Sequence, residues 1–415
     1  MSRNEPLIEI DSARLNKRIQ DIAAIGSTLN GGSNRQALTD EDAEARNLFM
    51  SWCENSACEV RVDSMGNIFA RRSGSNPNAD PILIGSHLDT QPTGGRFDGV
   101  YGVLAGLEVI ESLNDSGIQT QAPVEVVVWT NEEGVRFGPP LTGSSAFAGK
   151  VTIEEVHGTM TVDGTTVRDD LLSTGFLGAE MPGARAFDSF FEAHIEQGPV
   201  LESEGTQIGV VTDIVGIRWV EVHLTGQDSH AGTTPMAYRK DALNGAARVM
   251  VALDDYVRSL DPLARLTVGK LNVEPNSGAT IPGAASFNCD LRHPDGAVLD
   301  RMESQIRREV ETIAQKFRLE SEVCVVLNKD PLPFNEEIVH TVRDAAESLG
   351  LSHRDILSGA GHDAMNLADH IPTGMIFVPC RDGVSHNEAE YAEPEDLAAG
   401  AAVLLKSMLS RAGIS

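Results

Sequence analysis

Three consecutive segments constrain the fold of this chain more than any other feature of its sequence. PILIGSH (81–87) is a continuous apolar run, which is typical of a strand covered on both faces. GVYGVLAGLEVIESLND (99–115) has the pattern of a helix with a face of small residues, and VEVVVW (124–129) is another apolar strand. This succession predicts α/β architecture, in which a sheet carries helices on both faces.

The same pattern extends to both sides of these segments. Further helices and strands are predicted at 11–25, 40–55, 58–62, 67–71, 335–349, 373–379 and from Pro394 onward. A chain of 415 residues exceeds the roughly 250–300 residues at which single hydrophobic cores usually stop growing, so we expect two domains.

Residues 214–327 follow a different order and are predicted to form the second domain. Segments with strand or helix patterns lie there at 217–226, 239–260, 265–274, 285–292, 297–317 and 321–328. Their order, β-α-β-β-α-β, is that of a ferredoxin-like unit. We therefore predict a larger domain made of residues 1–213 and 328–415, with residues 214–327 inserted between its two halves.

Charge and composition exclude several classes of partner. The chain has 33 basic and 61 acidic residues, a formal net charge of -28, which argues against a nucleic-acid partner or an anionic membrane surface. Its N-terminus has no apolar core of signal-peptide length, and no later run approaches the roughly 20 apolar residues of a membrane span. We expect a cytoplasmic protein whose five cysteines, without a C-x-x-C pair, are reduced and structural.

Side chains with metal-binding chemistry are concentrated where the predicted strands end. His87 and Asp89 close the PILIG strand, and Asp98 follows a glycine-rich turn just before the next helix. Open α/β sheets bind ligands outside the carboxyl ends of their strands. His87 and Asp98 could therefore ligate a metal, and Asp89 could orient the site without binding the metal itself.

Two adjacent acids, Glu132 and Glu133, follow the VEVVVW strand. In an extended segment successive side chains point to opposite faces, so we expect the two carboxylates to have different roles. For such a pair considered by itself, a solvated strand end is the more frequent explanation.

Two histidines complete a possible donor set: His194 in FFEAHIEQGPVLE and His386 in RDGVSHNEAE. A single histidine is more often satisfied by one hydrogen bond than bound to a metal. Taken together, however, His87, Asp98, Glu133, His194 and His386 are the inventory of a dinuclear site for borderline metals, with Asp98 placed to bridge.

A family resemblance runs from about residue 10 to residue 410. It is carried, in chain order, by GSHLDTQPTGGRFDGVYGVLAGLEV, VVWTNEEGVRF, AHIEQGPVLE, GQDSHAGTTPM, NVEPNSGATIPG, DLRHPD, GAGHDA and SHNEAE. These motifs resemble the dinuclear metallo-amidohydrolases related to aminoacylase and carboxypeptidase G. More narrowly, they resemble the hydantoinase/carbamoylase branch, which contains N-carbamoyl-L-amino-acid hydrolases, β-ureidopropionases and allantoate amidohydrolases. The resemblance implies a zinc-peptidase-like mixed sheet with an inserted ferredoxin-like domain that serves as lid and dimerisation surface.

The resemblance also implies two divalent ions per chain. His87 and His194 would hold one ion, Glu133 and His386 the other, and Asp98 would bridge them. Zinc or manganese is expected, and this mixed set of histidine and carboxylate donors also accepts cobalt or nickel. In the peptidase members an acidic residue usually stands where His194 stands here, so this histidine favours the carbamoylase branch.

Further residues receive roles from the same resemblance. Glu132 would be the general base, and His230 would stabilise the oxyanion, although His230 could equally be a loop histidine that caps the following helix. Arg292, which by itself would pass for a surface residue, would grip the substrate carboxylate through its bidentate fork. The complete set of implied substrate contacts is Asn276 and Arg292 at the carboxylate, with Gln197 and His362 at the ureido group or its neighbourhood.

The sequence thus predicts a homodimeric metal-dependent amidohydrolase for a small ureido acid. It would release an amino acid, carbon dioxide and ammonia from an N-carbamoyl-L-amino acid or N-carbamoyl-β-alanine. Closure of the inserted domain would use hinges near Asp213–Gly216 and Asn328–Pro331. The alternatives are an allantoate amidohydrolase, an aminoacylase or peptidase, and a non-catalytic metal-binding dimer on an inherited fold.

Overall fold

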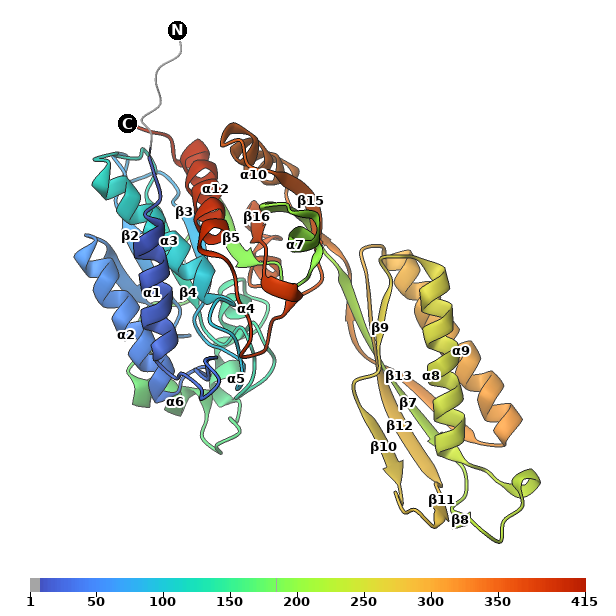
Figure 1. Ribbon diagram of the computed structural model, residues 1–415. Coiled ribbons are helices and arrows are strands. Elements are labelled where there is room, and N and C mark those ends of the chain that lie inside the picture. Colours follow the sequence, from blue (N-terminus) through green and yellow to red (C-terminus); the bar gives the residue numbers. More distant parts are fainter. Residues whose placement is uncertain (1–7, 184) are drawn as a thin grey trace. The chain divides into compact units, whose positions relative to one another are not determined.

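The computed structural model describes residues 8–183 and 185–415, which divide into two compact units. The larger unit combines the residues up to Thr212 with Phe334–Ser415, and the smaller unit is Asp213–Pro333. The larger unit is therefore assembled from both ends of the chain, as Figure 1 shows by its blue and red segments.

The helices and strands of the larger unit alternate along the chain. Those before the smaller unit are α1 (Ser12–Ala24), α2 (Asp40–Asn55), β1 (Glu59–Val62), β2 (Ile68–Arg72), β3 (Ile82–His87), α3 (Val100–Asp115), β4 (Val124–Trp129), α4 (Thr142–Phe147), α5 (Ile153–Gly158), α6 (Val167–Thr174), β5 (Ser189–Ile195), α7 (Val200–Glu204) and β6 (Ile208–Ile214). Those after it are α10 (Glu336–Ser348), β15 (His353–Ser358), α11 (Ala364–Leu367), β16 (Thr373–Val378), η2 (Arg381–Gly383) and α12 (Pro394–Ala412).

One mixed sheet forms the centre of this unit, in the strand order β1-β2-β4-β3-β5-β16-β6, with β15 beside β6. The neighbours β4, β3, β5 and β16 are parallel, whereas β2 and β6 run antiparallel to them. Every residue of these four parallel strands is buried, so both faces of the sheet are covered. The predicted α/β fold is confirmed, and the carboxyl ends of the four strands lie along one edge.

The helices of the larger unit agree only in part with those predicted from the sequence. The predicted helices 11–25 and 40–55 are found as α1 and α2, and side chains of Asp11 and Thr39 cap them by accepting backbone N–H groups. No element is predicted from the sequence between residues 142 and 214, although α5 and α6 each begin with a capping box. Among the described residues, no helix is both long enough and apolar enough to cross a membrane.

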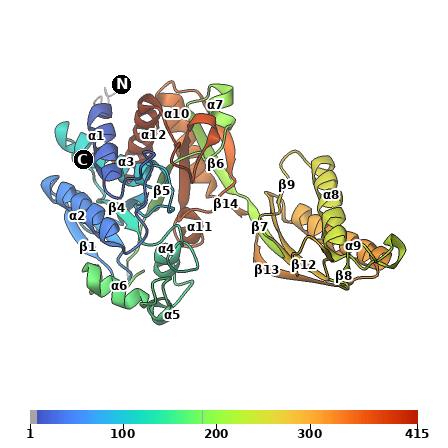
Figure 2. The same ribbon diagram turned by 60° about the horizontal axis from the view of Figure 1, so that its bottom comes forward.

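The smaller unit has an antiparallel sheet in the order β10-β12-β7-β13, with β9 also beside β12. Helices α8 and α9 pack on this sheet and on each other (Figures 1 and 2). Its elements are β7 (Gly216–Thr225), β8 (Ser229–His230), η1 (Met236–Tyr238), α8 (Ala242–Leu260), β9 (Arg265–Thr267), β10 (Leu271–Glu274), β11 (Thr280–Ile281), β12 (Ala284–His293), α9 (Gly296–Phe317), β13 (Glu320–Lys329) and β14 (Leu332–Pro333).

Burial alternates along β7 and β12, so one face of this sheet packs on the helices and the other is less covered. The single strand predicted at 265–274 is wrong. It is divided into β9 and β10, and Gly269 lies in the break. A glycine inside a strand pattern weakens pairing, because it has no side chain to pack and a large conformational entropy.

A buried ion pair in α2 is expected to contribute measurably to the stability of the larger unit. Arg46 Nε donates to Asp42 Oδ2 at 2.7 Å, and both side chains are completely buried. Asp42→Ala is expected to lower the free energy of unfolding by about 3–5 kcal/mol, because the guanidinium stays buried without its partner. Urea-induced unfolding measures this loss.

The matched control is the pair Asp254 and Arg258 in α8, which has the same spacing and the same 2.7 Å hydrogen bond. Its side chains are 50% and 76% exposed, so solvent screens the charges. Asp254→Ala is expected to leave the unfolding midpoint unchanged. Equal losses from the two substitutions would show that burial does not set the cost of breaking such a pair.

Candidate metal centre

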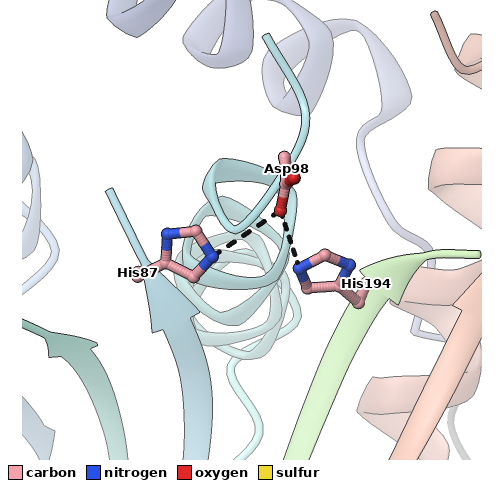
Figure 3. A group of neighbouring side chains, drawn as sticks. All are labelled: His87, Asp98 and His194. Carbon is pink, nitrogen blue, oxygen red and sulfur yellow. Dashed lines mark ion pairs between the residues drawn. The ribbon is translucent and has the colours of Figure 1, made fainter. Parts of the chain in front are cut away.

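Three buried side chains meet at the carboxyl edge of the parallel strands. His87 is the last residue of β3, His194 lies near the end of the neighbouring β5, and Asp98 precedes α3. Figure 3 shows both imidazole rings directed at one carboxylate oxygen. Asp98 Oδ1 is 3.6 Å from His87 Nε2 and 3.1 Å from His194 Nε2. These residues form the first ligand group.

A second ligand group uses the other oxygen of the same carboxylate. Asp98 Oδ2 is 3.3 Å from His386 Nε2, which is 3.5 Å from Glu133 Oε2. Glu133 follows β4 and His386 follows β16, so this group also comes from strand ends. In each group the possible ligand atoms lie within 4.8 Å of one another. The structure thus brings together all five predicted metal ligands, in two groups that share Asp98.

Hydrogen bonds place the ring protons of the two buried histidines away from the centre. His87 Nδ1 lies 2.9 Å from the carbonyl oxygen of Asp89, and His194 Nδ1 lies 2.9 Å from that of Ile195. Because a carbonyl oxygen only accepts, each Nδ1 carries the proton, and in the neutral ring the lone pair is on Nε2. This is the tautomer that a ligand bound through Nε2 requires.

The charges at the centre also fit bound cations. Burial raises the pKa of Glu132 well above its usual range, and burial together with the Asp98 carboxylate raises the pKa of Glu133 to about 7. Burial acts in the same direction on Asp98, but hydrogen bonds from the three histidines, which their protonated rings can donate through Nε2, hold its pKa well below its usual value. Crowded carboxylates combined with imidazole nitrogens form a donor set suited to borderline divalent metals.

Asp89 anchors the loop that carries both glutamates. Its carboxylate accepts the backbone N–H groups of Glu132 at 3.3 Å and Glu133 at 3.1 Å, while its carbonyl orients His87. The expectation that strand alternation separates the two glutamates is wrong, because β4 ends at Trp129 before either of them. In the loop that Asp89 anchors, Glu132 lies near His87 and Glu133 lies near His386.

Glu132 lies beside the ligand groups without belonging to them. Its Oε2 is 3.7 Å from His87 Nε2, and its side chain is buried. Among the described residues, the possible ligand groups at this edge include Glu133 but not Glu132. The two adjacent carboxylates are therefore available for different tasks, as expected from the sequence. The reason is the geometry of their loop and not the alternation of a strand.

Gln197 and His362 were predicted to contact the substrate, and both lie next to ligands. Gln197 Nε2 donates to Asp98 Oδ2 at 2.8 Å. His362 packs edge-on against the ring of His194, with the ring centroids 4.5 Å apart, and its side chain is buried. Burial and the neighbouring His194 hold the pKa of His362 well below its usual value, so its ring is neutral. Their contact with the substrate stays a prediction.

A third possible group consists of Glu192, His194 and His362. Both oxygens of Glu192 already accept hydrogen bonds, from the Ser86 hydroxyl at 2.7 Å and the backbone N–H of Ala364 at 2.9 Å. His362 Nε2 lies 3.0 Å from Ser358 Oγ. His194 Nε2 is directed at Asp98. We therefore assign no ion to this group.

His230, in the smaller unit, is held in one tautomer. Its Nδ1 accepts the backbone N–H groups of Gly232 at 3.0 Å and Thr233 at 3.2 Å. In the neutral ring the proton is therefore on Nε2, and the side chain is exposed. Nε2 is then an available N–H donor, the chemical group that stabilises an oxyanion, and this role of His230 stays a prediction. The hydrogen bonds cap a turn and not the helix α8, which begins at Ala242 with Asp241 as its cap.

The other two predicted residues of the smaller unit differ in their surroundings. Arg292, on β12, makes paired hydrogen bonds from Nε to Asp290 Oδ1 at 3.1 Å and from Nη2 to Asp290 Oδ2 at 2.9 Å. Asn276 is exposed and has a left-handed backbone with φ of 53°. The Arg292 guanidinium thus already binds a carboxylate in bidentate geometry, that of Asp290, and its contact with a substrate carboxylate stays a prediction.

One residue beside the centre was not predicted. Glu390 is buried and accepts backbone N–H groups from the turn that carries Asp98. It ends the SHNEAE motif, four residues after the predicted ligand His386. An acid in the same motif as a predicted ligand could have suggested a role at the site. The sequence spacing does not reveal, however, that its carboxylate binds the backbone N–H groups of Phe97 and Asp98.

Comparisons with known proteins agree along nearly the whole chain. The sequence model of peptidase family M20/M25/M40 matches residues 83–410. An N-carbamoyl-L-amino-acid amidohydrolase of Rhizobium meliloti is 46% identical over 98% of this chain and 97% of its own length. An allantoate amidohydrolase of Escherichia coli K12 is 36% identical over 92% of this chain and 94% of its own. The crystal structure of a hydantoinase/carbamoylase family amidase from Burkholderia multivorans is 50% identical, with a TM-score of 0.94, over 98% of this chain and 99% of that one.

Proposed function

This chain belongs to peptidase family M20/M25/M40, and from that premise we propose that it is a metal-dependent amidohydrolase of N-carbamoyl-L-amino acids. It cleaves the carbamoyl C–N bond with one water molecule and yields the amino acid, carbon dioxide and ammonia. The observation that carries this proposal is the pair of ligand groups that share Asp98, with Glu132 beside them. Similarity to a carbamoyl amidohydrolase over 98% of the chain supports the substrate class.

The reaction follows from the positions of the side chains. His87 and His194 would hold one divalent ion, Glu133 and His386 another, and Asp98 would contribute one oxygen to each. Ions in these positions supply Lewis-acid activation of water and of a carbonyl group.

Glu132 takes the proton of the attacking water and delivers it to the leaving nitrogen. Asp89 keeps the carboxylate of Glu132 in place through the backbone of its loop. Burial of Glu132 excludes competing solvent from this proton transfer.

Several finer expectations from the sequence stay predictions. They are oxyanion stabilisation by His230, recognition of the substrate carboxylate by Asn276 and Arg292, hinges near 213–216 and 328–331, dimerisation through residues 214–327, a cytoplasmic location, and the identity of the metal. Zinc or manganese is the first choice for the metal, because the donor set combines imidazole nitrogen and carboxylate oxygen.

Allantoate is the main alternative substrate, since the allantoate amidohydrolase of Escherichia coli matches over most of the chain. Its 36% identity is lower than the 46% shared with the carbamoyl amidohydrolase, which favours the carbamoyl amino acid. An aminoacylase or peptidase fits less well with His194 among the ligands. A non-catalytic metal-binding dimer would not need a buried Glu132 beside the ligand groups.

Metal loading and a substrate panel test this function together. Purified protein is expected to hold up to two divalent ions per chain and to release ammonia faster from N-carbamoyl-L-amino acids than from N-carbamoyl-β-alanine or allantoate. A chelator is expected to abolish the activity, and added Zn²⁺ or Mn²⁺ to restore it. Elemental analysis and ammonia release are the measurements.

The outcomes separate the alternatives. Faster release from allantoate or N-carbamoyl-β-alanine would reassign the substrate while keeping the metal centre. Full activity in a protein free of divalent metal would overturn the whole mechanism. Binding of both ions without hydrolysis of any panel member would favour the non-catalytic alternative.

A further inference from the structure

Glu390 has the hydrogen-bonding pattern of a residue that holds a loop in place. Its side chain is buried, and Oε1 accepts the backbone N–H groups of Phe97 at 2.9 Å and Asp98 at 3.1 Å. These two groups belong to the turn that presents the shared carboxylate to both ligand groups. Two buried backbone donors of that turn therefore have their partner in a side chain nearly three hundred residues away in the sequence.

The other oxygen of Glu390 connects to the loop of the second ligand group. Ser385, which precedes His386, lies with its hydroxyl 2.9 Å from Glu390 Oε2 and 3.1 Å from Asp98 Oδ2. One carboxylate thus holds the backbone of the shared ligand on one side and the loop of His386 on the other. The single hydroxyl proton of Ser385 can be donated to either carboxylate but not to both at once, so Ser385 bridges Glu390 and Asp98 by alternating between them.

Gly95 lies against the Glu390 carboxylate, and its lack of a side chain permits this contact. A Cβ atom built on Gly95 would lie 2.0 Å from Glu390 Oε1, closer than any real side-chain contact. The turn before Asp98 can approach the carboxylate only because position 95 has no side chain. The close approach links the sequence of the turn, GGRFDG, to the acid at the end of SHNEAE.

We propose that Glu390 is a positioning residue for the metal centre, which fixes the backbone of Asp98 relative to the loop of His386. This inference rests on the proposed function and goes beyond it, because it assigns a role to a residue outside both ligand groups. Glu390 acts as Asp89 does on the other side of the centre, where a buried carboxylate holds the N–H groups of Glu132 and Glu133. Outer partners of this kind typically contribute about 10- to 100-fold to metal affinity.

The effect should be largest on the ion of the second ligand group. His386 lies in an exposed loop with a left-handed backbone of φ 52°, and its side chain is 52% exposed, whereas His87 and His194 are buried at strand ends. The first group keeps two ligands on strands β3 and β5 when Glu390 is lost. In the second group all three ligands come from loops, and Glu390 connects two of these loops, those of Asp98 and His386.

The test is calorimetric titration of metal-free protein with Zn²⁺ or Mn²⁺. Glu390→Ala is expected to weaken the weaker of the two binding steps by about 10- to 100-fold. Glu390→Gln is expected to retain most of the affinity, because its amide oxygen accepts the same two N–H groups and its amide nitrogen donates to Ser385. Ser385→Ala, at a partly exposed position where folding is not at risk, is expected to weaken the same step several-fold.

Asp63 offers a matched control. It is a buried carboxylate that accepts the backbone N–H groups of Met65 and Asn67 and one side-chain N–H of Asn67, but it belongs to neither ligand group. Asp63→Ala is expected to lower the thermal unfolding midpoint without changing metal affinity. Glu390→Ala is expected to change both.

The possible results either support or overturn the positioning role of Glu390. Wild-type affinity for both ions in Glu390→Ala, or in Ser385→Ala should Glu390→Ala fail to fold, overturns the positioning role. Equal losses in Glu390→Gln and Glu390→Ala also overturn it, because charge and not backbone anchoring would then matter. An equal loss of metal affinity in Asp63→Ala would mean that Glu390 affects metal binding only through general stability, and would overturn the positioning role. If the wild type itself binds neither ion, the proposed function fails and not this inference alone.

Discussion

Glu132→Gln is expected to bind its metal ions like the wild type while kcat falls by about 10²- to 10⁴-fold, the usual contribution of a general base. The amide keeps the shape of the side chain, and the Asp89 carboxylate still holds the backbone of residue 132. Neither ligand group loses a donor, because Glu132 lies beside them. Steady-state kinetics and metal analysis of the same preparation measure the two effects separately.

Glu133→Gln is the matched comparison, since it makes the same chemical change one position later in the same anchored loop. It removes a carboxylate oxygen 3.5 Å from His386 Nε2 and so weakens the second ligand group itself. Metal affinity should fall by more than the roughly 10- to 100-fold typical of an outer partner. A nearly fully active Glu132→Gln, or a loss of metal from Glu132→Gln but not from Glu133→Gln, would reverse the assigned roles.

Arg292→Lys is expected to lower kcat/KM by roughly thirty-fold to several thousand-fold without changing metal content. If the guanidinium grips the substrate carboxylate, loss of this charged, desolvated hydrogen-bond pair costs about 2–5 kcal/mol. An ammonium cannot reproduce the two parallel bonds that Arg292 already makes to Asp290. Kinetics with a free-acid substrate and with the same compound amidated at its carboxylate are the measurement.

Arg265 supplies the control, because it lies directly opposite Arg292 in the pairing of β9 with β12. Arg265→Lys makes the same exchange on the adjacent strand and is expected to leave kcat/KM unchanged. The amidated compound should be a poor substrate for the wild type and should lose little further in Arg292→Ala. Equal losses for the free acid and the amide would make Arg292 a structural residue of the smaller unit.

Much of the fold could be predicted because its strongest signals are local. The apolar runs of β3, β4 and β16 and the helical spacing of α3 and α12 lie in single continuous segments. Short elements were missed because a helix such as α4, or a strand pair such as β8 with β11, contains too few residues to display a period. Their stability comes from packing and pairing with distant segments.

The candidate site was predictable to the level of residue types. His87, Asp98 and the glutamates stand at the ends of recognisable strands, and the parallel order of those strands brings their ends to one edge. His194 and His386 could be proposed only together with the other donors, since one histidine in a loop or strand has no distinctive spacing, and their assignment to separate ions depended on the family resemblance. Glu390 was not predicted because its hydrogen-bond partners are backbone groups from another part of the chain.

By itself, the sequence determined a covered α/β sheet and an inventory of donors at its strand ends, because periodicity and residue type are properties of short segments. The family resemblance implied how those donors divide between two ions, but only the tertiary structure supplies the physical basis of that division. Each oxygen of Asp98 faces a different ligand group, and the carbonyl of Asp89, not its carboxylate, orients His87. Glu132 approaches His87 and Glu133 approaches His386 from a loop in which Asn131 is left-handed, at φ 58°. Such choices depend on hydrogen bonds between residues tens to hundreds of positions apart, which no local pattern encodes.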